Sequence, residues 1–256
     1  MRAVALVLIA LAIAGCGRAP APVTKVSATP AAVASTTPQV AACPEPTPPK
    51  DEHGKPWPPT LQKPPPISRE FRDIVSASTT VMTVKGLKGQ LICVDLYIID
   101  GISDYQFSDA AHRFFGFEKT DEESNGHYVI DRAMSGNAAI IETGTQPLFS
   151  DDDIMFASQQ WGDGMDGDLD KLGIWAVGPS GTTQLAELDE PTNDNRFGHW
   201  DSIGWSGNRC FELSALTNDE VDSAEYGDDP HKWPGHRFRV VPVGKTWRLQ
   251  PGKCPR

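Results

Sequence analysis

Short apolar runs separated by turn-forming residues dominate the chain from residue 67 to its end. The runs are rich in Val, Ile and aromatic residues, and Gly, Asn, Asp or Pro bounds each of them, as is typical of β-strands. Strands are predicted over residues 79–85, 91–100, 127–131, 138–143, 171–177 and 237–243. Helical character is limited to 68–75 and 108–114, each short enough to be a single turn. The pattern predicts an all-β domain.

Tight turns join several of these runs directly. The tripeptide 135–137 (Ser-Gly-Asn) separates two runs, and 178–181 (Gly-Pro-Ser-Gly) separates 175–177 from 184–188. Gly244 and Lys245 stand between Val243 and Thr246, and Gly in the first position favours a type II′ turn. Such turns return the chain alongside itself, so the sheets are expected to be antiparallel.

A different apolar run stands at the N-terminus. Residues 3–11 are all aliphatic and follow Arg2, and Ile13-Ala14-Gly15-Cys16 comes soon after them. The run is too short to cross a bilayer, which needs roughly 20 residues. Together these features resemble the signal peptide and lipobox of bacterial lipoproteins.

The resemblance implies that residues 1–15 are removed and that Cys16 becomes the acylated first residue of the mature chain. Several acyl chains, palmitate among them, would then hold the protein on the lipid membrane almost permanently. Some bacteria sort lipoproteins by the residue that follows the acylated cysteine, and an aspartate there favours the inner membrane. In such a host, Gly17 implies an outer-membrane lipoprotein that faces the periplasm.

A composition shift follows the cysteine at once. Residues 17–66 hold 14 of the 22 prolines, mixed with Ala, Thr, Ser and Val. Proline cannot donate a backbone hydrogen bond, and the segment has few large apolar residues to offset the ordering entropy. Residues 16–66 are therefore predicted to be a lipidated N-terminus and a disordered linker, and residues 67–256 a single domain.

The predicted domain is strongly acidic. From residue 67 onward there are 17 Lys and Arg against 31 Asp and Glu, a net charge of −14. Like charge repels phosphate backbones and anionic headgroups, so nucleic acid is excluded as a partner. A basic protein or a divalent cation would be attracted.

Four cysteines remain besides the lipobox cysteine, namely Cys43, Cys93, Cys210 and Cys254. An even number in an oxidising compartment indicates two disulfides, for which three connectivities exist. A bridge from Cys254 to Cys43 or to Cys210 would tie down the chain end. The alternative for Cys93 is a small buried residue with a free thiol.

Residues 147–158 begin Pro-Leu-Phe-Ser-Asp-Asp-Asp. They resemble the blade motif P-x-W-S-P-D-G of TolB-type, WD40-like β-propellers, with Asp151 in place of the proline and Asp153 in place of the glycine. The preceding hairpin resembles the middle strands of such a blade, and 203–208 resembles a weaker second copy. The resemblance implies fold roles for Phe149, Ser150 and Asp152. It favours partial propeller-like blades, with a β-sandwich as the alternative and the closure of the sheets left open.

The densest group of potential ligands lies in the acidic loop 162–170. Asp163, Asp166, Asp168 and Asp170 supply carboxylates of the kind that Ca²⁺ prefers. The loop is not an EF-hand, because Lys171 stands at the glycine position and Val177 at the glutamate position. A solvated acidic hairpin tip is the alternative.

No pattern in the sequence specifies catalysis. The segment around Ser206 misses the G-x-S-x-G elbow by one position, and His231 and His236 are spaced unlike a metalloprotease pair. The sequence thus favours a non-catalytic, protein-binding lipoprotein of the bacterial envelope. The alternatives are an inhibitor or immunity protein for a basic cell-wall hydrolase, and an envelope hydrolase.

Overall fold

The structure is a computed structural model that describes residues 42–109, 111–120, 125–161, 169–189, 197–222, 230–233 and 235–255. All of these residues belong to one compact unit, Pro38–Arg256. The described residues form fifteen strands, one short α-helix, α1 (Asn218–Asp222), and 3-10 turns at Arg69–Phe71, Gly136–Ala139 and Pro230–Lys232. The all-β prediction is confirmed.

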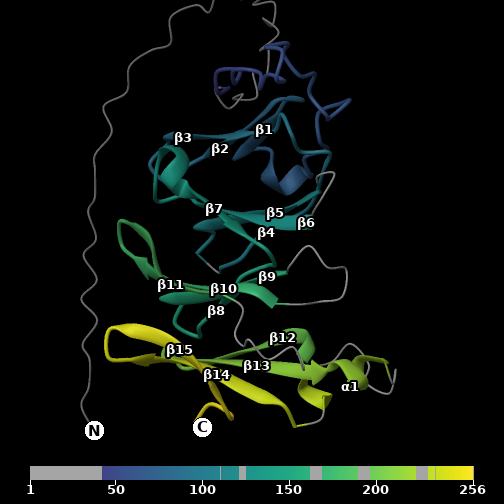
Figure 1. The fold of residues 1–256 in the computed structure, drawn as a ribbon. Helices are drawn as coiled ribbons and strands as arrows, with labels where there is room; N and C mark the ends of the chain where they lie inside the picture. Colours follow the sequence, from purple (N-terminus) through teal and green to yellow (C-terminus); the bar gives the residue numbers. More distant parts are fainter. Residues whose placement is uncertain are drawn as a thin grey trace, which may run out of the picture. The chain divides into compact units, whose positions relative to one another are not determined.

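The strands make four small antiparallel sheets that follow one another along the chain (Figure 1). The first sheet contains β1 (Val75–Ala77), β2 (Val81–Lys85) and β3 (Leu91–Asp95). The second contains β4 (Gly101–Phe107), β5 (Phe114–Thr120), β6 (Asn125–Asp131) and β7 (Ile140–Thr143). The third contains β8 (Leu148–Phe149), β9 (Met155–Trp161), β10 (Leu169–Gly178) and β11 (Gly181–Asp189). The fourth contains β12 (Phe197–Ser206), β13 (Cys210–Thr217), β14 (Arg237–Val243) and β15 (Thr246–Pro251). In every sheet, neighbours in sequence are neighbours in space.

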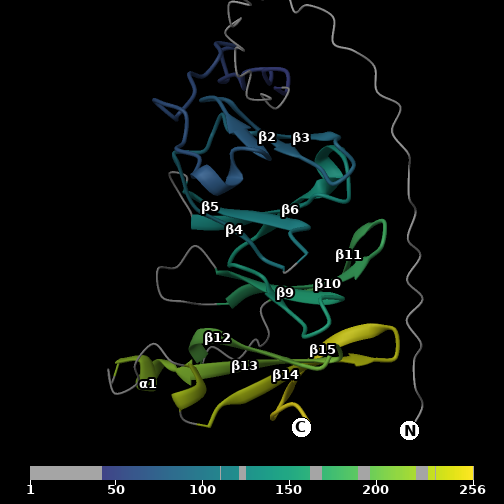
Figure 2. The same cartoon turned by 180° about the vertical axis from the view of Figure 1, so that it is seen from behind.

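The four sheets are stacked in chain order (Figure 2). An apolar layer of side chains lies between each sheet and the next. Phe115 and Phe117 face the first sheet, whereas their strand neighbour Phe114 faces Phe156 of the third sheet. The next layer joins the third sheet to the fourth, where Phe211 is fully buried. Because successive side chains of a strand point to opposite faces, an inner sheet buries both. This explains why β5 begins with four consecutive buried residues.

Of the two segments predicted to be helical, one is confirmed and the other is wrong. The turn at Arg69–Phe71 lies within the predicted segment 68–75, but none of the described residues of the predicted segment 108–114 is helical. There the carboxylate of Asp109 accepts hydrogen bonds from the backbone N–H groups of Arg113 and Phe114. A side chain that binds the local backbone in this way competes with the helical pattern.

Residues 42–66 also differ from the prediction of a disordered linker. Cys43 and Leu61 are buried, and the Cys43 N–H donates to Thr83 Oγ1 at 2.9 Å. The Thr60 hydroxyl donates to the carbonyl of Ile99 at 2.6 Å. This part of the proline-rich segment therefore packs on the first sheet, and the domain begins before residue 67.

The cysteines form two disulfides, Cys43–Cys93 and Cys210–Cys254, with Cα–Cα distances of 5.7 and 5.8 Å. Two bridges were predicted, and the Cys210–Cys254 alternative is confirmed. The alternatives of a Cys43–Cys254 bridge and of a free Cys93 are both wrong. One bridge holds the start of the described chain on the first sheet, and the other holds its end on the fourth.

Candidate functional site

The blade-like motif of residues 147–158 builds the turn between β8 and β9. The hydroxyl of Ser150 donates to Asp152 Oδ1 at 2.8 Å and accepts from the Met155 N–H at 3.0 Å. Phe149 packs on Phe156, with ring centroids 5.0 Å apart. These contacts are the fold roles that the resemblance implied. Asp153, in the motif's glycine position, has a φ of 55°, the left-handed conformation that glycine adopts without strain.

A related turn joins β4 to β5 in the second sheet, and it was not predicted from the sequence. Phe107-Ser108-Asp109 repeats the letters of Phe149-Ser150-Asp151. His112 has a φ of 55°, as Asp153 does, and in each turn the serine N–H donates to a carbonyl at the start of the next strand. The repeated Phe-Ser-Asp tripeptide is the feature of the sequence from which the second turn could have been predicted. Both serine–aspartate turns hold the backbone, one through the hydroxyl of Ser150 and the other through the carboxylate of Asp109.

A buried ionic network ties the second sheet to the third. Arg113 donates from Nε and Nη2 to the two carboxylate oxygens of Asp131, each at 2.7 Å. Thr182 Oγ1, in the β10–β11 hairpin, donates to the same carboxylate at 2.7 Å, and Arg113 Nη1 donates to the Gly178 carbonyl. Asp131 is fully buried. Burial raises the pKa of Asp131, but the hydrogen bonds from Arg113, Thr182 and the Ala133 N–H outweigh it and lower the pKa.

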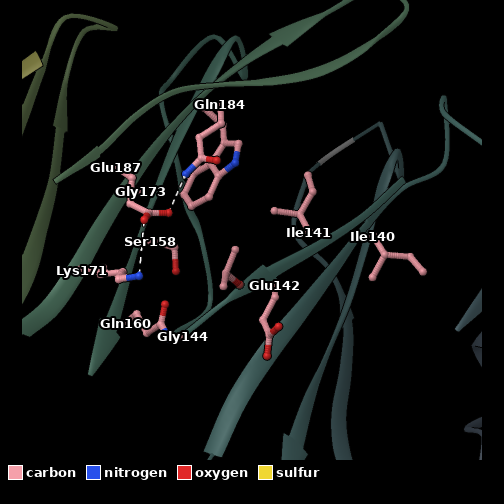
Figure 3. A pocket seen from close by; sticks show the side chains of 12 residues that line it. Ile140, Ile141, Glu142, Gly144, Ser158, Gln160, Lys171, Gly173, Gln184 and Glu187 are labelled. Carbon is pink, nitrogen blue, oxygen red and sulfur yellow. Dashed lines mark hydrogen bonds and ion pairs between the residues drawn. The ribbon is translucent and has the colours of Figure 1, made fainter. Parts of the chain in front are cut away.

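A polar cleft of about 290 Å³ lies between the same two sheets, away from this network, and is the candidate binding site (Figure 3). The four residues of β7 and Gly144 form one wall, and β9, β10 and β11 form the other. Figure 3 shows Lys171, Glu187 and Gln184 linked in a row opposite Ile140 and Ile141. Lys171 Nζ lies 3.4 Å from Glu187 Oε1, and Gln184 Nε2 donates to Glu187 Oε2 at 3.1 Å.

Two glycines shape the cleft. A Cβ at Gly144 would come within 2.3 Å of the Gln160 Cα, so only glycine lets the end of β7 approach β9 this closely. A Cβ at Gly173 would overlap the indole of Trp175, which lies across it and stacks on Phe156 with ring centroids 4.9 Å apart. The base of the cleft is thus fixed by backbone contact and aromatic packing, while its charged rim is half exposed.

His127 lies beside the cleft wall and is 1% exposed. Its Nδ1 is 3.4 Å from Thr143 Oγ1, and its ring covers Gly116. Its Nε2 is buried and has no hydrogen-bond partner among the described residues. Burial lowers the pKa of His127 to about 4, so the imidazole is neutral at pH 7. A neutral, enclosed imidazole acts as a packing group in the cleft wall.

The fourth sheet contains the other group of titratable side chains. Burial raises the pKa of Asp201, and the charges of His199 and His231 oppose that shift. His236 Nε2 lies 3.2 Å from Glu220 Oε1. The two histidines of 231–236 therefore interact with different carboxylates, His236 with Glu220 and His231 with Asp201. Ser206 Oγ donates to the Pro255 carbonyl at 2.6 Å and thereby fastens the chain end.

The remaining predicted site residues fall outside what the structure describes. These are the lipobox cysteine, Cys16, and the cation candidates Asp163, Asp166 and Asp168. Asp170 lies in β10, but its side chain is not among the described groups. Within the described ranges, no group of three or more His, Cys, Asp or Glu side chains is arranged to hold a metal ion. The calcium prediction stays a prediction.

Comparison with protein-family models, curated proteins and solved structures finds no match to this chain. In the part of the chain that is described, none of the helices has the length and apolar character needed to span a bilayer. The described residues thus form an all-β protein of four small sheets. One disulfide-bonded segment lies on the first sheet and another on the fourth.

Proposed function

We propose that this chain is a bacterial envelope lipoprotein, anchored through acylated Cys16, whose acidic all-β domain binds a basic protein partner without converting it. The observation that carries the proposal is the pair of disulfides, because such bonds persist in oxidising compartments outside the cytoplasm. The lipobox-like segment at residues 13–16 gives the same compartment independently.

The fold supports a binding role more than a catalytic one. The best-defined buried carboxylate, Asp131, is committed to Arg113 and Thr182, and the serine–aspartate turns hold backbone. Within the all-β class, we propose that the sheets are propeller-like blades. The simple strand order of each sheet and the Ser150 turn support this interpretation over a two-sheet sandwich.

The charge is distributed unevenly along the domain. Residues 67–189, which include the first three sheets, contain 8 Lys and Arg against 21 Asp and Glu, whereas residues 190–256 contain 9 against 10. A basic partner is therefore expected to approach the part of the domain that holds the first three sheets. Association steered by such a field falls steeply as ionic strength rises.

Replacing Cys16 with Ser should release the chain from the membrane. Without the thiol no acyl chain can be attached, and the predicted linker offers no other anchor. The measurement is fractionation of cells that express the full chain, with mass spectrometry of the N-terminus. Cys16→Ser in the soluble fraction and an acylated Cys16 in the parent chain are expected. An unmodified Cys16 in the parent would contradict the anchor.

The alternative that the chain inhibits a basic cell-wall hydrolase can be tested by measuring the activity of such an enzyme in the presence of the chain. We expect a lysozyme-type enzyme to lose activity when the full chain is added at low salt and to recover it above about 0.5 M salt, where screening is nearly complete within a few ångströms. Full activity at low salt would remove the inhibitor alternative. Turnover of peptidoglycan by the chain itself would favour the hydrolase alternative instead.

A further inference from the structure

We infer that the free edge of β7 binds an extended, basic segment of the partner protein by strand addition in the cleft between the second and third sheets. The inference rests on the proposed function, because it names how the partner is held. It begins from the way β7 lines the cleft. All four consecutive residues of the strand, Ile140–Thr143, contact it. Because side chains alternate between the two faces of a strand, four consecutive residues line a cleft only when the backbone edge faces it.

That edge is unpaired among the described strands. The second sheet has the order β4-β5-β6-β7, so β7 pairs with β6 alone. The N–H of Ile140 donates to the Asn137 carbonyl in the preceding 3-10 turn and therefore points away from β6. Backbone direction alternates along a strand, so the N–H of Glu142 also points away from β6, toward the cleft. An extended segment can accept this hydrogen bond.

The other sheet edges carry features that discourage pairing, and β7 carries fewer of them. Register shifts interrupt the pairing of β4, β11 and β12. The edge strands β1 and β8 have three and two residues, and β15 ends in Pro251. The edge strand β3 is joined to the preceding chain through Cys93. By contrast, β7 reads Ile-Ile-Glu-Thr, with neither proline nor lysine and no register shift. Natural sheets usually protect their edges with such features, so an unprotected edge beside a cleft fits strand addition.

The charge of the domain around the cleft selects the chemistry of the occupant. The side chains of Glu142 and Glu187 are 57% and 49% exposed at the rim of the cleft. Each forms an ion pair with a lysine, Glu142 with Lys119 at 2.6 Å and Glu187 with Lys171 at 3.4 Å, so these charges balance locally. The net charge of −14 on residues 67–256 therefore favours an extended segment that carries Lys or Arg among β-branched residues.

Selection of peptides against the full-length chain in detergent tests this assignment. The probe is a displayed library of short random peptides, from which the tightest binder is synthesised. We expect a β-branched sequence with Lys or Arg. Its affinity should fall about tenfold in Glu142→Pro relative to Glu142→Gln, since one hydrogen bond and the fit of the strand are lost. Glu142→Gln is the matched control, because it removes the carboxylate but keeps the N–H.

Hydrogen exchange gives a readout that does not depend on the proline variant folding. The Glu142 amide should exchange fast in the free chain and slowly with saturating peptide. A peptide methylated at alternate backbone nitrogens should lose binding. Failure to select any peptide, equal affinity for Glu142→Pro and Glu142→Gln, or an unchanged exchange rate at Glu142 would overturn the assignment. A basic partner that binds Glu142→Pro as tightly as the parent would leave the proposed function standing and remove only the role of β7.

Discussion

Replacing Asp131 with Asn is expected to lower the free energy of unfolding by about 3–5 kcal/mol, the cost of leaving one member of a buried ion pair without its partner. The side chain of Arg113 is only 14% exposed and donates three hydrogen bonds, two of them to Asp131. With Asn at 131, the guanidinium keeps its charge but faces an amide that cannot neutralise it. The loss should appear as a fall in Tm of about 10 °C.

The matched control is Asp73→Asn, because Asp73 is exposed and its loss should change stability by less than about 0.5 kcal/mol. Thermal and urea unfolding of the full chain give the measurement. A drop as small as that of the control would mean that Arg113 and Asp131 are hydrated and that the network does not fasten the second sheet to the third.

The pH dependence of the Asp131→Asn effect follows from the direction of the pKa shift. The folded-state pKa of Asp131 is lowered, so its stabilisation is complete above the unfolded value of about 3.9. It is lost as pH falls below that value, because the unfolded chain then binds the proton first. The difference between parent and variant should therefore be constant from pH 7 to about 5 and shrink below pH 4.

His127 also titrates under acidic conditions but does not disturb this comparison. Burial lowers its pKa to about 4, so the unfolded chain takes up its proton as pH falls below the ordinary value of about 6.5. Both proteins therefore lose stability equally between pH 6.5 and 4. Only the difference between them reports Asp131.

Much of the fold could be predicted because each strand carries its own local pattern. The Gly244 turn shows this, since it joins Val243 to Thr246 with a φ of 64° at Gly244, as a type II′ turn requires. Composition was less informative for residues 42–66. There a few contacts, such as that of Cys43 with Cys93, order a segment whose average character predicts disorder. Local averages cannot detect order that one long-range bond creates.

The candidate site could not be predicted, because it depends on how two sheets meet. Trp175 and Glu187 are separated from Glu142 along the chain, and no motif links them. The sequence instead directed attention to the acidic loop, where carboxylates are adjacent. The edge of β7 is likewise invisible in sequence, since whether a strand pairs on one side or two depends on sheet order.

Removing the Cys210–Cys254 bridge is the second large expected effect. The bond closes a loop of 44 residues that spans most of the fourth sheet, and chain entropy assigns it about 4 kcal/mol. The bridge also holds the Cys254 N–H on Glu212 Oε2 at 3.0 Å. Without it, the tail beyond β15 should detach and expose the fourth sheet.

The double variant Cys210→Ala/Cys254→Ala is preferred to a single replacement, because a lone thiol would exchange with the other bridge. The companion variant Cys43→Ala/Cys93→Ala opens a loop of 50 residues, and the logarithmic dependence on length predicts nearly the same cost. Urea unfolding of both, with and without reductant, gives the measurement. A cost below about 1 kcal/mol for the first variant alone would mean that contacts such as that of Ser206 with Pro255 suffice to hold the chain end. Equal costs would instead show that both ends of the stack of sheets are held chiefly by their disulfides.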